Sequence, residues 1–260
     1  MKKKNKNELP IAVIDSGVGG ISVLRELIKI MPRENYIYFG DSKNAPYGSK
    51  EKAEVLEITR SNLRMLQNRG IKALVVACNT ATSAAVRILR QENPDLVIVG
   101  IEPAIKPPAV TLDHPRVLVM ATPLTLKEEK FQRLVSRYSD MAEIISLPCH
   151  RLAELVEGGN IDTPELEEYV ASLLEPYRDQ NIDALVLGCT HYPHVRKTIE
   201  RHVSPSVKIF DGGEGTARET RRRLEVANLL CPEDQVGVID ICNSSNDEQM
   251  LELSKRLLYK

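Results

Sequence analysis

The sequence lacks an excess of basic residues. Its 35 lysines and arginines are balanced by 36 aspartates and glutamates, which gives a formal net charge of −1. Nucleic-acid-binding proteins usually carry a clear basic excess, because phosphate contacts supply most of their affinity. The run Arg218–Glu225 is rich in arginine, but it mixes both signs as a solvated helix face does. We therefore expect no nucleic-acid partner.

Long hydrophobic runs are also missing. No apolar run approaches the roughly 20 residues that a membrane-spanning helix needs. Segment Met1–Asn7 is rich in lysine and asparagine, and Glu8–Pro10 follows where a secretory signal would have its apolar core. We expect a solvated N-terminal tail and no membrane partner.

Closely paired cysteines are absent as well. The five cysteines are odd in number and widely spaced, and no CxxC pair occurs. This pattern favours reduced thiols in the cytoplasm over a disulfide framework. They are Cys78, Cys149, Cys189, Cys231 and Cys242. We expect a cytoplasmic protein.

No cluster of residues with the spacing of a metal site is present. The close pairs are Cys189 with His191 and His191 with His194, and no other cluster completes four ligands. We predict no metal. His194 is expected to face solvent or to pack within its helix.

Short apolar runs alternate with longer amphipathic segments along the chain. Strands are predicted at Ile11–Ile14, Tyr36–Phe39, Ala73–Ala77 and Leu96–Val99, with helices at Ile21–Ile30, Lys50–Asn68 and Thr82–Gln91 between them. The alternation continues from Val117–Met120 to Val236–Ile241. Such alternation is typical of the α/β class, in which helices cover both faces of mainly parallel sheets.

An internal repeat predicts two similar lobes. Ile71–Cys78 aligns with Ile182–Cys189, and Ile11–Ser16 aligns more weakly with Val117–Thr122. Chance matching of apolar strands explains the strands alone, but less easily a cysteine at the same place in both copies. We expect lobes related by a pseudo-twofold axis, with the active site in the cleft between them.

Two segments have the composition of crossings between lobes. Gly100–Pro108 is rich in proline, Asp211–Gly215 is rich in glycine, and each follows a predicted strand. Two crossings predict a first lobe formed by residues 1–102 and 213–260, with residues 103–212 inserted as the second lobe.

Polar residues stand just past several predicted strands. Ligands of parallel α/β sheets bind at the carboxyl ends of the strands. We therefore expect the side chains at these positions to reach one cleft. They are Asp15, Asp41, Cys78, Thr122 and Cys189.

Cys78 and Cys189 are the candidate catalytic pair. A buried structural role is the commonest fate of an intracellular cysteine, but these two stand at the polar end of equivalent strands. A helix N-terminus lowers the pKa of a thiol, so both protonation states become accessible near neutrality. Opposed thiols can take a proton from one face of a carbon and return one to the other. This predicts a reaction that inverts a carbon centre by removing and returning a proton.

Each thiol has a candidate helper nearby. Asp15 could orient Cys78 or accept its proton, and the alternative for Asp15 is a helix cap or an Asx turn. His191 stands on the same short turn as Cys189 and could play the matching part there.

The turn Asp15–Gly20 also invites a dinucleotide-binding interpretation. That fingerprint needs a glycine where Ser22 stands, and Asp15 would place a carboxylate against the pyrophosphate. Asp41 would mimic its ribose-binding acid. The same turn can equally hold a carboxylate with its backbone amides.

At these residues the chain resembles the glutamate racemases of the aspartate/glutamate racemase superfamily, over almost its whole length after the tail. The matching stretches are Asp15–Gly20, Phe39–Asp41, Ala45–Gly48, Ala77–Thr82, Leu155–Glu157 and Leu187–Pro193. The resemblance implies interconversion of L- and D-glutamate without a cofactor, which supplies D-glutamate for peptidoglycan.

The resemblance also implies roles for single residues. Cys78 and Cys189 would be the acid/base pair, supported by Asp15 and His191, with Glu157 as an auxiliary carboxylate. The implied substrate contacts, with Thr82 and Thr122 as further candidates, are Asp15, Ser16, Tyr47, Gly48, Asn79, Thr80, Thr190 and His191.

The sequence leaves other activities open. A racemase or decarboxylase acting on aspartate or a malonate, a non-catalytic small-ligand binding protein and an inhibitory partner of another protein are the alternatives. A homodimer is also left open.

Overall fold

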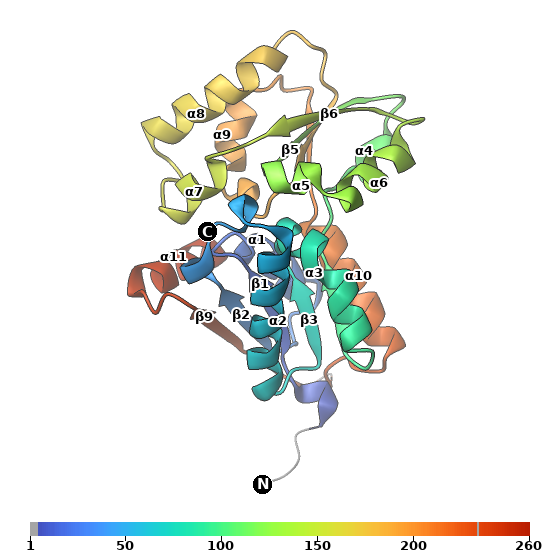
Figure 1. Ribbon diagram of the computed structural model, residues 1–260, viewed down its shortest axis with the longest axis vertical. Helices are drawn as coiled ribbons and strands as arrows, with labels where there is room; N and C mark the ends of the chain where they lie inside the picture. The colour runs from blue at the N-terminus through green and yellow to red at the C-terminus, as the bar shows by residue number, and fades with distance from the viewer. Residues whose placement is uncertain (1–4, 233) are drawn as a thin grey trace.

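The computed structural model describes residues 5–232 and 234–260, and the chain folds into two lobes stacked along the long axis of the molecule (Figure 1). The first four residues of the expected N-terminal tail lie outside the described residues. Each lobe contains one parallel sheet flanked by helices, as the sequence predicted. Among the described residues, no helix combines the length and the apolar character needed to cross a membrane.

The two sheets repeat the same strand order. The first sheet runs β4-β3-β1-β2-β9 and the second runs β6-β5-β7-β8, with all strands parallel. Read from the other edge, the second order is β8-β7-β5-β6, which corresponds to β4-β3-β1-β2. The strands are β1 (Ile11–Asp15), β2 (Tyr36–Gly40), β3 (Ala73–Val76), β4 (Val97–Gly100), β5 (Arg116–Ala121), β6 (Glu143–Pro148), β7 (Ala184–Leu187), β8 (Lys208–Asp211) and β9 (Ile239–Asn243).

Helices cover both faces of the first sheet. Helix α1 packs against α10 and α11 on one face, while α2 packs against α3 on the other. The five helices are α1 (Ile21–Ile30), α2 (Lys52–Asn68), α3 (Asn79–Glu92), α10 (Gly213–Val226) and α11 (Glu248–Tyr259). Because side chains alternate along a strand, Ile11 and Val13 join one core while Ala12 and Ile14 join the other. Burial on both faces explains why the strands are continuously apolar.

The second lobe is built from shorter helices. They are α4 (Lys106–Thr111), α5 (Pro123–Lys127), α6 (Glu129–Tyr138), α7 (Leu152–Glu157), α8 (Pro164–Leu174) and α9 (Arg196–Arg201). The C-terminus lies at the junction of the lobes (Figure 1), where Lys260 Nζ is 3.1 Å from a carboxylate oxygen of Asp162 in the second lobe.

Some elements differ from the sequence-based expectation. Strand β6 was not predicted, because it is a partly exposed edge strand that includes a glutamate, a serine and a proline. The last strand begins at Ile239 instead of Val236, whose side chain is 83% exposed. Helix α3 begins at Asn79, three residues before the predicted start, because Cys78 itself caps it.

The two chain crossings lie side by side. A Cβ atom at Gly212 would be 2.6 Å from the carbonyl oxygen of Glu102 and 2.8 Å from Cγ1 of Ile101. Glycine is therefore required where the return crossing passes the outward one. The two adjacent crossings form the covalent connection between the lobes.

A buried ion pair ties together distant parts of the first lobe. The Lys72 ammonium lies 2.5 Å from the Glu34 carboxylate, and both side chains are almost completely buried. Lys72 also donates to the carbonyl oxygen of Asn7 at 2.6 Å, and Glu34 accepts from the backbone N–H of Cys231 at 2.9 Å. The pair thus joins the start of the chain to the segment that follows α10.

We expect Lys72→Met to lower the free energy of unfolding by about 3–5 kcal/mol, because it leaves the Glu34 charge buried without a partner. The midpoint of urea unfolding followed by circular dichroism measures this. The matched control is Lys29→Met, which removes the exposed Lys29–Glu26 pair and should leave the midpoint unchanged. Equal midpoints for both variants would contradict the assigned role of the buried pair.

Candidate active site

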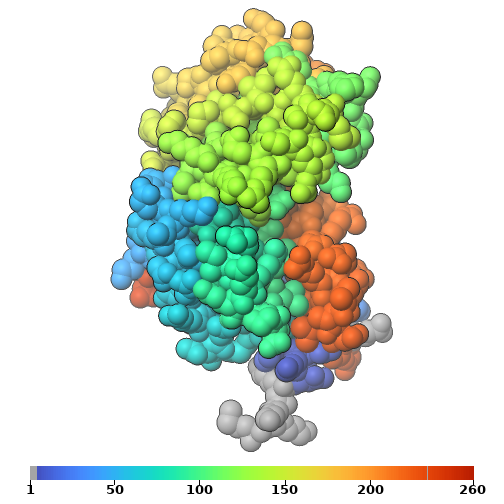
Figure 2. Space-filling view, turned by 45° about the vertical axis from the view of Figure 1, so that its right-hand side comes forward, coloured from blue at the N-terminus to red at the C-terminus, as the bar shows by residue number. Residues whose placement is uncertain are grey.

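A cavity of about 670 Å³ lies between the lobes, and both Cys78 and Cys189 line it. Cys78 follows β3 of the first sheet and Cys189 follows the equivalent strand β7 of the second. The cavity therefore forms where the carboxyl ends of the two sheets face each other, as parallel α/β folds favour. The space-filling view shows the lobes in direct contact along this junction (Figure 2).

Cys78 is held in the cap of helix α3. Its sulfur accepts a hydrogen bond from the backbone N–H of Ala81 at 3.5 Å, and its thiol lies 3.8 Å from the Ser16 hydroxyl. Burial and the nearby Asp15 carboxylate raise the pKa of the Cys78 thiol to about 12, although the Ala81 N–H opposes this. The expectation of a lowered thiol pKa is wrong for Cys78, because desolvation outweighs the helix N-terminus.

Cys189 belongs to a chain of three polar groups. Its sulfur is 3.5 Å from Nδ1 of His191, and Nε2 of His191 is 2.5 Å from Oε1 of Glu157. His191 thus stands beside Cys189, as the sequence predicted. The turn after Cys189 leads into a 3₁₀ helix, Tyr192–Val195, rather than directly into an α-helix. The repeat is therefore imperfect at its two catalytic candidates.

The charges of Glu157 and His191 stabilise each other. Burial opposes charge on the imidazole, but the hydrogen bonds and charges of Cys189 and Glu157 outweigh it and raise the pKa of His191 well above its ordinary value. Burial likewise opposes ionisation of Glu157, and the hydrogen bond and charge of His191 lower its pKa. An imidazolium with both ring nitrogens bonded can donate to the carboxylate and to a thiolate at once.

Glu157 also connects the second lobe to the first. Its Oε1 accepts a hydrogen bond from the backbone N–H of Val18 at 2.6 Å, and its Oε2 lies 3.4 Å from the Ser42 hydroxyl. A Cβ atom at Gly17 would be only 1.8 Å from Glu157 Oε1. The glycine-rich turn after β1 therefore binds the Glu157 carboxylate. Glycine at position 17 is required by the close approach.

Asp15 is oriented by the turn and by the opposite lobe. Its Oδ1 accepts from the Gly17 N–H, which is an Asx-type turn, and its Oδ2 accepts from the Thr190 hydroxyl, both at 3.0 Å. Burial raises the pKa of the Asp15 carboxyl, His191 opposes this and the negative charge of Glu157 adds to it. Asp15 thus acts on Cys78 through its charge, and its hydrogen bond from Thr190 links the two lobes.

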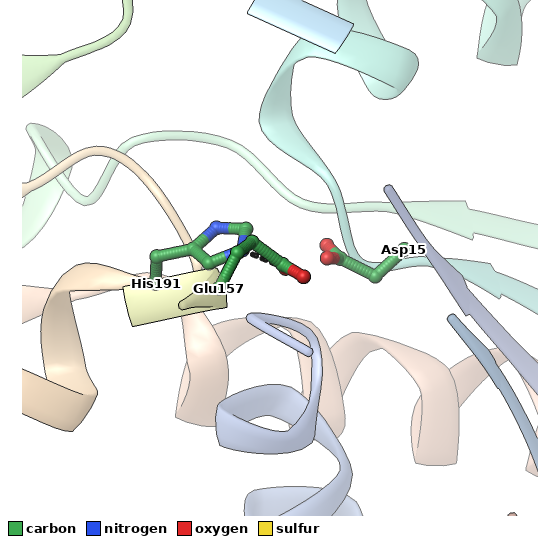
Figure 3. Close-up of side chains that lie close together, drawn as sticks. All are labelled: Asp15, Glu157 and His191. Carbon is green, nitrogen blue, oxygen red and sulfur yellow. Dashed lines mark hydrogen bonds and ion pairs between the residues drawn. The ribbon is translucent and has the colours of Figure 1, made fainter. Parts of the chain in front are cut away.

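Asp15, Glu157 and His191 form one compact group. Figure 3 shows the Asp15 carboxylate directed toward Glu157 and His191, and one ligand atom from each residue lies within 4.8 Å of the others. These three atoms could hold a metal ion. Each group, however, already has hydrogen-bond partners in the protein, and the raised pKa of His191 favours a proton over a metal ion on its ring. We interpret the group as a charge and proton network.

Most of the expected substrate contacts line the cavity. Ser16, Tyr47, Gly48, Asn79 and Thr80 all face it, and so does Thr122. The amide oxygen of Asn79 is buried without a hydrogen-bond partner among the described residues, so it is free for a ligand. Three expected contacts lie behind the cavity wall: Asp15, Thr190 and Thr82, whose hydroxyl donates to the carbonyl of Val76 at 3.1 Å.

Tyr47 is fixed by Asp41, which the dinucleotide interpretation had made a ribose ligand. The Tyr47 hydroxyl donates to Asp41 Oδ2 at 2.6 Å, and Asn44 and Asn62 also donate to this carboxylate. Burial opposes the charge of Asp41, but Ser244 together with these hydrogen bonds lowers the pKa of its carboxyl. Asp41 therefore supports the cavity wall from behind.

Sequence reasoning missed several residues of the wall. The loop and helix after β6, and the segment between β9 and α11, reach the cavity without a recognisable motif. Cys149 is one of five widely spaced cysteines and has no motif of its own, whereas the Thr125 hydroxyl follows Thr122 by one helical turn. The missed lining residues include Ser42, Thr125, Cys149, His150, Ala153, Glu154, Ser245, Asp247 and Met250.

The sequence pattern of the Asp/Glu/Hydantoin racemase family matches residues 11–220. The chain belongs to this family. It is 48% identical over 258 residues to a glutamate racemase from Clostridium botulinum, and the match covers 99% of both chains.

Solved structures agree with this membership. Glutamate racemase from Francisella tularensis, in complex with D-glutamate, superposes with a TM-score of 0.84 at 26% identity over 98% of this chain and 95% of that one. The Escherichia coli glutamate racemase, in complex with L-glutamate and the activator UDP-MurNAc-ala, gives a TM-score of 0.84 at 29% identity over 96% of this chain and 95% of that one.

In this racemase-family chain, we expect Glu157→Gln to lower the pKa of His191, because the substitution removes the negative partner that stabilises the imidazolium. At neutral pH a smaller fraction of His191 then carries a charge. The titration of the His191 ring protons, followed by NMR, measures the change.

Glu167→Gln is the matched control for this titration. Glu167 bonds His202 at 2.7 Å on the surface of the second lobe, so its loss should leave the His191 midpoint in place. A His191 midpoint that is the same in Glu157→Gln and in the unaltered protein would show that Glu157 does not set the charge of this ring.

Proposed function

We propose that this chain interconverts L- and D-glutamate with Cys78 and Cys189 as opposed acid and base, and without a cofactor. One observation carries the proposal: the two cysteines follow equivalent strands of two similar lobes and line one cavity. Inversion requires proton removal on one face of the α-carbon and proton delivery on the other. The relatives named as glutamate racemases support glutamate as the substrate.

Cys189 is the better placed base of the two thiols. The imidazolium of His191, 3.5 Å from the sulfur, can donate a hydrogen bond to a thiolate and neutralise its charge. Glu157 keeps that imidazolium charged through its bond to Nε2. The thiolate takes the proton from the α-carbon, and the electron pair of the broken C–H bond stays on the carbon skeleton, delocalised into the α-carboxylate.

Cys78 is the acid in the same half of the cycle. Because its pKa is raised to about 12, the thiol keeps its proton at neutral pH and can deliver it to the opposite face of the carbanion. The new C–H bond uses the electron pair left by the first step. In the reverse direction, the buried Cys78 thiolate is a strong base, as removal of a weakly acidic C–H proton demands.

The cavity offers dipoles rather than cations for the substrate carboxylates. No lysine or arginine lines it within the described part of the chain. The N-terminus of helix α3, the Ser16 and Thr80 hydroxyls and the Asn79 side chain are the groups available to hold anionic oxygens. Water exclusion between the lobes strengthens each of these contacts at the developing carbanion.

The wider setting follows from the same reaction. We assign the product, D-glutamate, to peptidoglycan synthesis and the enzyme to the cytoplasm, where its five unpaired thiols stay reduced. We also place the lobe boundaries at residues 102/103 and 212/213. In support, β4 ends at Gly100 before α4 begins at Lys106, and β8 ends at Asp211 before α10 begins at Gly213.

Single substitution of either thiol tests the mechanism. We expect Cys78→Ala and Cys189→Ala each to lower racemisation of L-glutamate at least about a thousandfold, because each removes an acid/base group that no neighbour replaces. Loss of optical activity, followed by circular dichroism with no added cofactor, measures the rate. Cys242→Ala, at a partly exposed thiol outside the cavity, should keep full activity.

Full activity in either cysteine variant would refute the two-thiol mechanism. Parallel assays with L-aspartate test whether glutamate is the substrate. A purely ligand-binding protein would show no turnover for any variant.

Turnover in heavy water tests the proton path. We expect product formed in D2O to carry deuterium on the α-carbon, because a thiol exchanges its proton with solvent before it reprotonates the opposite face. Mass spectrometry of the product at early times measures the incorporation. Complete retention of the original hydrogen would rule out two exchanging thiols.

A further inference from the structure

His194 makes a contact that its sequence position did not predict. Instead of facing solvent, its ring is partly buried, and Nε2 lies 3.1 Å from the carbonyl oxygen of Gly19. Since a carbonyl only accepts, this nitrogen carries the ring hydrogen and donates. His194 belongs to the 3₁₀ helix after Cys189, whereas Gly19 belongs to the turn after β1. The bond therefore joins the two lobes.

Gly19 lies directly against His191 of the other lobe. A Cβ atom at this position would lie 2.4 Å from Nδ1 of His191, 2.6 Å from its Cε1 and 2.7 Å from the Thr190 hydroxyl. The imidazole of His191 thus packs against the backbone of Gly19. Nδ1 is also the nitrogen that faces the Cys189 sulfur. A shift of Gly19 would remove the surface that packs against the His191 ring.

The remaining links between the two turns are few and short. The Ser22 hydroxyl lies 2.9 Å from the carbonyl oxygens of both Gly19 and Thr190, and the Thr190 hydroxyl donates to Asp15. Together with His194, these groups connect the turn of Asp15 to the turn of Cys189 behind the cavity. His194 does not line the cavity itself.

We propose that His194 is a positioning residue, whose hydrogen bond to Gly19 holds the glycine turn against His191 and so keeps His191 aligned between Cys189 and Glu157. The inference rests on the proposed racemisation and goes beyond it, since it concerns a side chain that reaches neither substrate nor reacting atoms. Loss of the bond lets the glycine turn and the Cys189 turn separate, which misaligns the thiol and its imidazole.

The charge state of His194 suits this role. Burial, the charge of His191 and the charge of Arg25 lower its pKa to about 4, although the Gly19 carbonyl opposes the shift. The ring is therefore neutral near pH 7, donates one hydrogen to Gly19 and adds no second positive charge beside the His191 imidazolium. A lysine or arginine at this place would compete with that imidazolium for Glu157.

The test compares two substitutions that differ in hydrogen bonding. His194→Gln keeps an N–H donor near the position of Nε2, whereas His194→Met fills the space without a donor. We expect kcat/KM of His194→Met to fall about tenfold. The loss should lie mostly in kcat, because His194 does not touch the substrate. It should be equal for L- and D-glutamate as substrate, because the two enantiomers have equal free energy. His194→Gln should stay within about threefold of the unaltered enzyme.

A pH profile separates positioning from general stability. The alkaline limb of kcat/KM should move to lower pH in His194→Met, because His191 is held less firmly to Glu157 and loses its proton sooner. His202→Met, a surface histidine bonded to Glu167, is the matched control and should leave both rate and limb unchanged. If His194→Met is insoluble, His194→Asn takes its place. The asparagine side chain is too short to reach the Gly19 carbonyl, so this variant should show the same losses as His194→Met.

A second measurement does not depend on glutamate turnover. We expect iodoacetamide to alkylate Cys189 at least about threefold more slowly in His194→Met than in His194→Gln, because the reactive thiolate loses its aligned imidazolium partner. The partly exposed Cys242 is the internal reference in mass spectrometry. If the unaltered protein fails to racemise glutamate, the proposed function falls while this comparison still decides the role of His194. Equal rates, profiles and alkylation in the methionine and glutamine variants would overturn the inference.

Discussion

The site depends on how closely the glycine-rich turn after β1 approaches the second lobe. A single added carbon at Gly17 would occupy the place of the Glu157 carboxylate, and one at Gly19 would occupy that of the His191 ring. Because Gly17 and Gly19 have no side chain, the backbone of the first lobe can approach the side chains of the second lobe closely. Glu157 accepts from Val18 and donors from the second lobe reach Gly19 and Asp15. Without this contact, the two thiols, which belong to different lobes, would not line one cavity.

A duplicated fold thus produces two unlike halves of one site. The strand orders correspond, and each cysteine stands after the same strand of its sheet. The surroundings differ because Cys78 has a helix cap and a neighbouring carboxylate, whereas Cys189 has an imidazolium held by Glu157. A thiol that keeps its proton and a sulfur with a cationic partner suit the acid and the base of one inversion.

Much of the fold could be read from local pattern. The buried strands are continuous apolar runs, the helices have helical spacing, and the repeat around Cys78 and Cys189 predicted two lobes. The sequence pattern did not predict edge strand β6, because a partly exposed strand lacks a continuous apolar run. Likewise, nothing local marked Ser245 or Met250 as cavity residues, since they reach it from the far end of the chain.

The sequence by itself determined the α/β class, the two lobes and the polar residues at the strand ends, because these follow from periodicity and from the order of elements along the chain. Only the tertiary structure decided the protonation of those residues and the partner of His194. The pKa of Cys78 rises because of burial, whereas that of His191 rises against burial because of the hydrogen bonds and charges of Cys189 and Glu157. Such effects sum over groups that are distant in sequence, so no local pattern encodes them.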